Sequence, residues 1–192
     1  MNVLALVCTL KPSPEPSSAD RFSDVLLAAF PGATTGKVRL ADVGVARGLQ
    51  HDMGGGDGWP GVKAQVAAAD VLVVVTPIWN GQPSSYFLQV GERLNAMLAD
   101  SDEQHRTPLY GKVALLGVVG NEDGAHHAGG IGMAMLADLG LSFGPACIAY
   151  YLGEDLVEQD EVPQQQREMA ALSCSNAAHL AAVLAQQAYP GV

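Results

Sequence analysis

The sequence is poor in basic residues, in cysteine and in long apolar runs, and each shortage excludes a class of protein. Its 192 residues include 10 Lys and Arg against 20 Asp and Glu, a formal net charge of −10. Nucleic acids and anionic membranes are bound by basic faces, so neither is expected as a partner. The acidic charge favours solubility. No apolar stretch is long enough to span a bilayer.

The three cysteines and five histidines indicate neither a catalytic thiol nor a metal site. Cys8 and Cys147 lie in apolar runs typical of packing, Cys174 lies in a helical stretch, and none has CxxC spacing. Among the histidines only His126 and His127 are paired. Because adjacent residues do not face the same way on a helix or strand, this pair is a poor metal ligand set.

The chain also begins without a basic segment ahead of its first apolar run. Residues 2–8 are therefore predicted to form a first strand, and a signal peptide is not expected. We expect a cytoplasmic protein. Residues 1–192 suit a single domain with a full hydrophobic core.

Short apolar runs alternate with helical segments along the whole chain. This alternation implies right-handed crossovers and a parallel sheet covered on both faces. The predicted fold class is α/β, a flavodoxin-like three-layer sandwich whose five-stranded parallel sheet has the order 2-1-3-4-5. A Gly-rich stretch at 43–60 is predicted to be a long loop, functional or merely on the surface. Strands are predicted at 2–8, 37–42, 71–76, 111–120 and 144–151, and helices at 17–30, 60–69, 84–99, 124–140 and 164–188.

The loop after the first strand is suited to an anion. Thr9, Ser17 and Ser18 offer hydroxyl groups, and the amides that begin the next helix favour negative charge. Capping of the helix by the serines is a simpler explanation, but it leaves the neighbouring Lys11 unexplained. The loop contains neither GxGxxG nor GxxxxGK(S/T), so a nicotinamide-type Rossmann site and a P-loop are both disfavoured.

A second loop, residues 76–82, follows the apolar run 71–75. Ligands of parallel α/β sheets bind just outside the carboxyl ends of the strands, which is where this loop is predicted to lie. Trp79 could stack on a planar ring or simply pack against the protein. The polar neighbours Thr76 and Asn80 favour ligand contact.

A third loop, residues 120–127, follows the apolar run 113–119. Glycines allow the backbone to approach a ligand closely, Asn121 can both donate and accept hydrogen bonds, and capping of the next helix is the preferred role of Asp123. His126 could contact a carbonyl or a substrate, or be solvated. The candidate residues of this loop are Gly120, Asn121, Glu122, Asp123, Gly124 and His126.

These motifs, each following a predicted strand and present in the right order, resemble the NADPH-dependent FMN reductase family of flavodoxin-like proteins. The similarity covers nearly the whole chain. It is carried by the run 69–79 (ADVLVVVTPIW), by 119–126 (VGNEDGAH), by 9–13 (TLKPS) with the serines at 17 and 18, and by segments 138–145 and 150–153.

The resemblance implies a noncovalent FMN and NAD(P)H as co-substrate. By motif position, the phosphate would lie at Thr9, Lys11, Ser17 and Ser18. Family members with an Arg in the first loop place it near the phosphate, where this chain has Lys11. The resemblance also implies a homodimer or homotetramer. One side of the isoalloxazine would be lined by Pro77, Ile78, Trp79 and Asn80, and its edge by Gly120, Asn121, Glu122, Asp123 and Gly124.

The resemblance thus predicts an FMN-dependent NAD(P)H oxidoreductase. Reducing equivalents would pass through the flavin to a quinone, a second flavin or another small acceptor. Because the flavin performs the redox chemistry, no catalytic side chain is predicted. Two alternatives stay open: a non-enzymatic electron carrier, whose acidic surface would dock to basic partners, and a flavin-free α/β binding domain.

Overall fold

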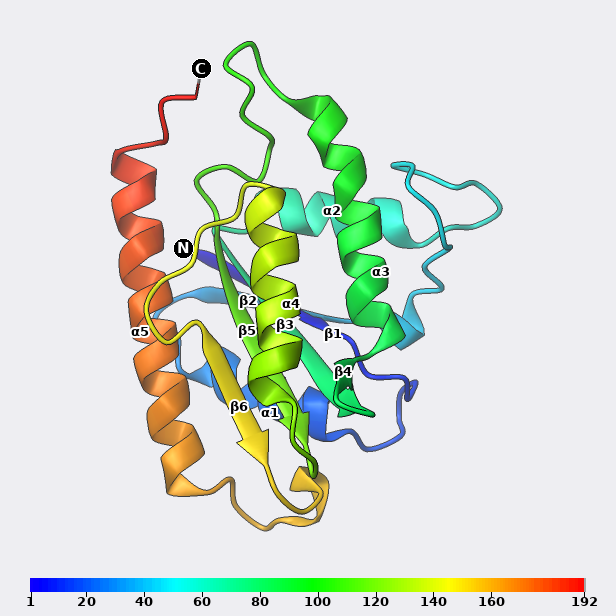
Figure 1. Cartoon of the computed structure of the whole chain (residues 1–192), viewed down its shortest axis with the longest axis vertical. Coiled ribbons are helices and arrows are strands. Elements are labelled where there is room, and N and C mark those ends of the chain that lie inside the picture. Colours follow the sequence, from blue (N-terminus) through cyan, green and yellow to red (C-terminus); the bar gives the residue numbers. More distant parts are fainter. Residues whose placement is uncertain (192) are drawn as a thin grey trace.

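Five parallel strands form the central sheet of the computed structural model, which describes residues 1–191 (Figure 1). The order is β2-β1-β3-β5-β6. Numbered along the chain, the parallel strands therefore have the order 2-1-3-4-5, which confirms the predicted flavodoxin-like sheet. The strands are β1 (Asn2–Val7), β2 (Thr34–Arg39), β3 (Val71–Trp79), β5 (Val113–Gly120) and β6 (Ile148–Leu152).

Helices cover both faces of this sheet. Helices α1 (Ser18–Ala28) and α5 (Gln164–Gln186) pack on one face. Helices α2 (Trp59–Ala68), α3 (Ser85–Leu94) and α4 (Ala125–Asp138) pack on the other (Figure 1). Strands β1, β3 and β5 are apolar over nearly their whole length because side chains on both faces are buried.

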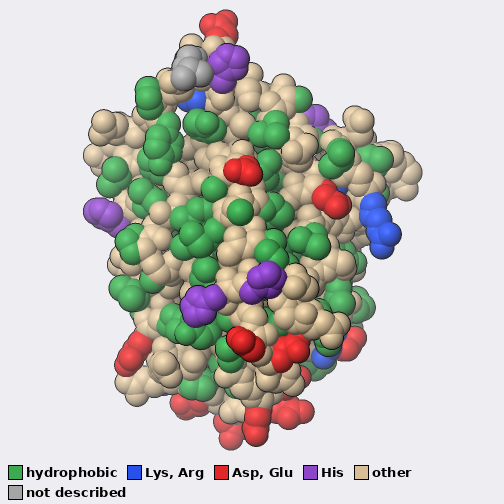
Figure 2. Space-filling model, in the orientation of Figure 1, with side chains coloured by type: hydrophobic (Ala, Val, Ile, Leu, Met, Phe, Trp, Pro, Cys, Tyr) green, Lys and Arg blue, Asp and Glu red, His purple; other side chains and the backbone are tan. Residues whose placement is uncertain are grey.

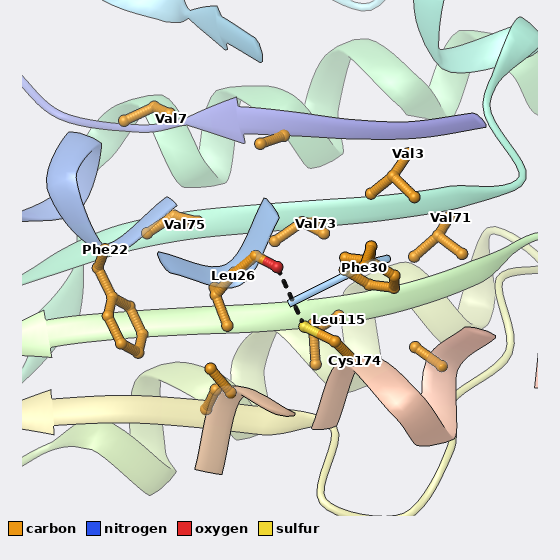
Figure 3. Packing of buried hydrophobic residues seen from close by; sticks show 14 of the residues in the cluster. Val3, Val7, Phe22, Leu26, Phe30, Val71, Val73, Val75, Leu115 and Cys174 are labelled. Carbon is orange, nitrogen blue, oxygen red and sulfur yellow. Dashed lines mark hydrogen bonds between the residues drawn. The ribbon is translucent and has the colours of Figure 1, made fainter. Parts of the chain in front are cut away.

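The core under α1 illustrates how this packing works (Figure 3). Phe22 and Leu26 of α1 point onto the sheet, and Leu26 lies beside Val75 of β3 and Gly117 of β5. The thiol of Cys174, from α5, donates to the Leu26 carbonyl at 3.3 Å. The cysteine is fully buried, and burial raises the pKa of its thiol to about 12. Its surroundings are those of a packing residue.

Several predicted boundaries were wrong. Strand β2 begins at Thr34 because its pairing with β1 starts there, and Leu40–Asp42 already form a 3₁₀ turn. Strand β6 begins only at Ile148, since Ala146 has a positive φ of 55° that interrupts the extended backbone. Helix α3 ends at Leu94 and continues as a 3₁₀ turn, Asn95–Asp100. The two-residue strand β4 (Gln82–Pro83), antiparallel to the end of β3, was not predicted.

The predicted long loop is present and is fixed to the protein body. It runs from residue 43 to 58 without helix or strand. Arg93 of α3 and Asp57 of the loop form a salt bridge of 2.6 Å between two fully buried side chains. Within residues 1–191, no helix is long and apolar enough to cross a membrane.

Candidate functional site

The loops after β1, β3, β5 and β6 surround one pocket at the carboxyl edge of the sheet. Its cavity volume is about 210 Å³, somewhat below the roughly 300–1,000 Å³ of typical small-molecule sites, so a larger ligand would extend out of its open mouth. This is the position at which flavodoxin-like sheets bind ligands. The lining residues are Thr9, Leu10, Lys11, Ser17, Ser18, Ala19, Pro77, Ile78, Trp79, Val119, Gly120, Asn121, Tyr151, Gly153, Glu154 and Asp155.

The first loop reaches the pocket with its hydroxyl groups already arranged. Ser17 is the N-cap of α1 and accepts a hydrogen bond from the Asp20 amide, as predicted for a cap. Its hydroxyl also donates to the Thr9 hydroxyl at 2.9 Å. Both side chains are buried. Lys11 lines the same wall, with its ammonium 3.2 Å from the Pro16 carbonyl.

Strand β2 holds this first loop in place from the side. The Arg39 guanidinium donates to the carbonyls of Lys11 (2.8 Å) and Glu15 (2.6 Å). Asp42, just beyond the strand, accepts from both the amide and the hydroxyl of Ser13 at 2.7 Å. The hydroxyl bond is the largest cause that lowers the pKa of Asp42. The backbone of the first loop is therefore held in place by β2 and the turn that follows it.

The second and third loops form the opposite wall. Pro77 and Ile78 line it, and Trp79 lies at the rim with 53% of its surface exposed. Gly120 of the third loop packs against Ile78 of this wall, since a Cβ atom at Gly120 would lie 3.0 Å from the Ile78 side chain. An alanine at position 120 would require the Ile78 side chain to shift slightly, so the two loops pack closely here.

Several of the predicted site residues do not line the pocket. Thr76 is fully buried, and its hydroxyl accepts from the Ser84 amide and donates to the Pro77 carbonyl. Asn80, with φ of 52°, forms the turn between β3 and β4. Glu122 reaches the Gly81 amide at 3.4 Å. The side chains of Thr76 and Glu122 thus bond to the strand end and the turn, and Asn80 supplies the turn backbone.

Helix α4 begins differently from the prediction. Asp123 was expected to cap it, but Gly124 is the N-cap, and no side chain makes a capping bond there. The Asp123 carboxylate accepts only from the Gly124 amide next to it, at 2.7 Å. His126 is exposed and lies edge-on to Tyr150, with 5.1 Å between ring centroids. Gly124, Asp123 and His126 therefore support the third loop from outside the pocket lining.

The wall after β6 was missed by the sequence reasoning. Tyr151, Gly153, Glu154 and Asp155 line the pocket. The Gly153 amide donates to the Gly120 carbonyl at 2.9 Å, which joins this wall to the third loop. Burial is the largest cause that raises the pKa of Tyr151, whose hydroxyl donates to the Glu154 carbonyl at 2.9 Å. In the sequence, segment 150–153 contributes only to the family resemblance.

The thiols of the chain are not activated. Burial raises the pKa of Cys8, which is enclosed beside β1, and that of the half-buried Cys147. Activated cysteines have the opposite shift, because a thiolate needs nearby positive charge.

Comparison with known proteins identifies this arrangement. The sequence profile described as NADPH-dependent FMN reductase matches residues 1–140, which include three of the four loops around the pocket. The chain belongs to the NADPH-dependent FMN reductase family. The family resemblance predicted from the motifs is thus confirmed.

Individual relatives extend the match beyond residue 140. The chain is 34% identical over 164 residues to 8-demethyl-8-aminoriboflavin-5'-phosphate synthase of Streptomyces davaonensis, covering 80% of this chain and 64% of that protein. It is 32% identical over 162 residues to a protein of Mycobacterium bovis named divalent metal cation transporter MntH, covering 80% of this chain and only 23% of that protein. The chain thus spans less than two thirds of either curated relative.

A solved structure shows similarity over almost the entire fold. The crystal structure of RosB with bound 8-demethyl-8-formylriboflavin-5'-phosphate has a TM-score of 0.83 and 29% identity, covering 98% of this chain and 82% of that chain. The β6 strand and the wall that follows it, outside the family profile, therefore lie within a shared fold.

Proposed function

We propose that the pocket binds FMN noncovalently and that the chain is a flavin-dependent NAD(P)H oxidoreductase. The observation that carries the proposal is the convergence of hydroxyl groups, Lys11 and an exposed indole around one pocket in a chain of this family. The bound flavin would supply two-electron redox chemistry. Its electrons would go to a quinone, a second flavin or another small acceptor.

The residues present fit such a ligand. Thr9, Ser17, Ser18 and Lys11 would hold the phosphate at the start of α1, where helix amides favour an anion. Pro77, Ile78 and Trp79 would contact one side of the ring system. At its edge, Gly120 leaves the backbone open to a ligand, and Asn121 offers both a donor and an acceptor.

The protein side chains would bind and orient the flavin without taking part as nucleophile or base. Lys11, Tyr151, Glu154 and Asp155 are the titratable residues of the described pocket lining. Tyr151 is held as a neutral phenol by its raised pKa and by its bond to the Glu154 carbonyl. The half-exposed Trp79 leaves the mouth of the pocket open to a second substrate, as hydride exchange with a nicotinamide requires.

Two measurements on the purified protein test this proposal. Titration with FMN should quench flavin fluorescence with a one-to-one endpoint. The FMN-loaded protein should then oxidise NADH or NADPH in the presence of a quinone, with FMN-free protein and free FMN as controls. FMN binding without any turnover of either nicotinamide would favour an electron carrier, and absence of FMN binding would leave only the flavin-free alternative.

A second candidate is the chemical modification of a flavin 5'-phosphate, for which FMN would be a substrate. It is favoured by the 34% identity to an 8-demethyl-8-aminoriboflavin-5'-phosphate synthase and by the TM-score of 0.83 to RosB. Mass spectrometry separates the two candidates after FMN has been incubated with the protein in air, with free amino acids as a source of the amino group. A flavin of changed mass supports modification, and an unchanged flavin with nicotinamide turnover supports the reductase.

A further inference from the structure

A carboxylate already lies where the proposed phosphate site begins. Ser18 is the first residue of α1, and its hydroxyl donates to the carboxylate of Asp155. The same hydroxyl accepts from the Leu156 amide at 2.8 Å. Ser18 and Asp155 both line the pocket, although 136 residues separate them in the chain. The side chain of Ser18 is therefore fully engaged with the wall after β6.

The charges around this contact are mostly negative. Lys11 is the one basic residue of the pocket lining, against the acidic Glu154 and Asp155. Its ammonium is shared with the Pro16 carbonyl and, at 3.8 Å, with the Glu15 carboxylate. Figure 2 shows acidic side chains gathered at the end of the molecule where the wall after β6 lies in Figure 1.

The nearby cations on α1 and β2 make their contacts with groups other than Asp155. Arg21 of α1 donates to the carbonyls of Leu156, Gln159 and Asp160, and so fixes the backbone of the wall after β6. Asp20 in the first turn of α1 pairs with Lys37 of β2 at 3.1 Å. Among residues 1–191 no cation forms a salt bridge with Asp155, so a phosphate at Ser18 would face an unpaired carboxylate.

We propose that Asp155 competes with the phosphate of a bound flavin for Ser18 and so determines how weakly this chain holds phosphorylated flavins. The inference rests on the proposed function. Two anions at one hydroxyl repel each other strongly in a partly enclosed site. The Asp155 carboxylate would therefore lower the affinity for FMN and leave that for riboflavin, which has no phosphate, unchanged. Bound FMN would therefore exchange with free FMN more readily than it would without this carboxylate.

Dissociation constants of FMN and riboflavin, measured by fluorescence quenching, test this inference. In Asp155→Asn we expect FMN to bind roughly tenfold more tightly, with the riboflavin constant within about twofold of wild type. Asp155→Ser should show the same selective gain in FMN affinity. Agreement of the two variants would show that the gain comes from loss of the carboxylate and not from the new Asn amide. Glu158→Gln removes a charge from the same loop outside the pocket lining and should leave both constants unchanged.

Failure of the Asp155 inference and failure of the proposed flavin-binding function give different results. If both Asp155 variants weaken FMN and riboflavin equally, the carboxylate is a ligand of the shared part of the flavin and the inference is wrong. Unchanged constants for both ligands also overturn it. If the wild-type protein binds neither FMN nor riboflavin up to the solubility limit of riboflavin, the proposed function itself fails.

Discussion

Gly124 and Gly81 meet backbone to backbone, which joins the third loop of the pocket to the second. A Cβ atom at Gly124 would lie 3.0 Å from both the Cα and the carbonyl oxygen of Gly81. Gly124 also has a φ of 128°, which side-chain-bearing residues rarely adopt. Glycine is thus required at this position by contact and by conformation together.

We expect Gly124→Ala to destabilise the fold by about 1–3 kcal/mol, the cost of one strained residue, and to weaken FMN binding. Urea unfolding and an FMN titration measure the two effects. The matched control is Gly130→Ala in the middle of α4, where nothing lies within 4 Å of an added Cβ. That change should stabilise the helix by about 0.5–1 kcal/mol. Equal stability of the two variants would contradict the assigned role of Gly124.

Trp79 is expected to contribute binding energy without contributing to folding. Its indole lines the pocket and is 53% exposed. Replacing it by Ala should weaken FMN and riboflavin alike, by roughly 5- to 30-fold if stacking supplies about 1–2 kcal/mol. Trp79→Phe should recover part of the loss. Leu88→Ala, an exposed change on α3, is the control for surface substitution. Unchanged flavin affinity in Trp79→Ala would exclude stacking.

The part of this site that could be predicted from sequence is the part built on local patterns. The apolar runs of β3 and β5 are buried on both faces, so they indicated the sheet and the two loops at its edge. The cap at Ser17 follows from residue type and spacing in the same way. In each case the relevant neighbours lie within a few residues along the chain.

What could not be predicted depends on contacts between distant segments. The position of Asp155 at the pocket is fixed by Ser18 and by three bonds from Arg21 to the same wall. No local motif marks that pairing. Strand β2 was misplaced for a related reason: Val38 is its one buried residue, so pairing with β1, rather than an apolar run, defines its ends. Asp123 does not cap α4 as predicted, because the N-cap position is taken by Gly124, where the close contact with Gly81 requires glycine.

Lys11 is expected to act on the phosphate alone. Lys11→Gln should weaken FMN binding by roughly three- to tenfold, because one partly exposed charge contributes about 1 kcal/mol, and should leave riboflavin binding unchanged. The dissociation constant of FMN should also rise more steeply with salt concentration in the wild-type protein than in the variant. Lys63→Gln on α2, outside the pocket lining, is the charge-matched control. An equal loss for both flavins would place Lys11 away from the phosphate.

The buried pair of Arg93 and Asp57 is expected to hold the 43–58 loop against α3. The guanidinium also donates to the Ala46 carbonyl at 3.0 Å and lies 5.6 Å from the centre of the Trp59 ring. Arg93→Met leaves a buried carboxylate without its counter-ion, which should cost about 3–5 kcal/mol of unfolding free energy. Urea unfolding measures it. The exposed pair of Arg106 and Asp102 is the control, since Arg106→Met should cost less than about 1 kcal/mol.

The same pair makes stability depend on acid pH. Burial alone would raise the pKa of Asp57, but hydrogen bonds from the Met53, Ala46 and Trp59 amides and from Arg93 lower it to about 2, against an ordinary value of 3.8. A lowered pKa adds stability above pH 3.8 that is lost as the pH falls toward 2. Asp57→Asn should therefore lose stability at neutral pH and lose less than wild type on acidification. A constant difference between the two proteins from pH 6 to pH 2 would mean that Asp57 does not titrate in this range.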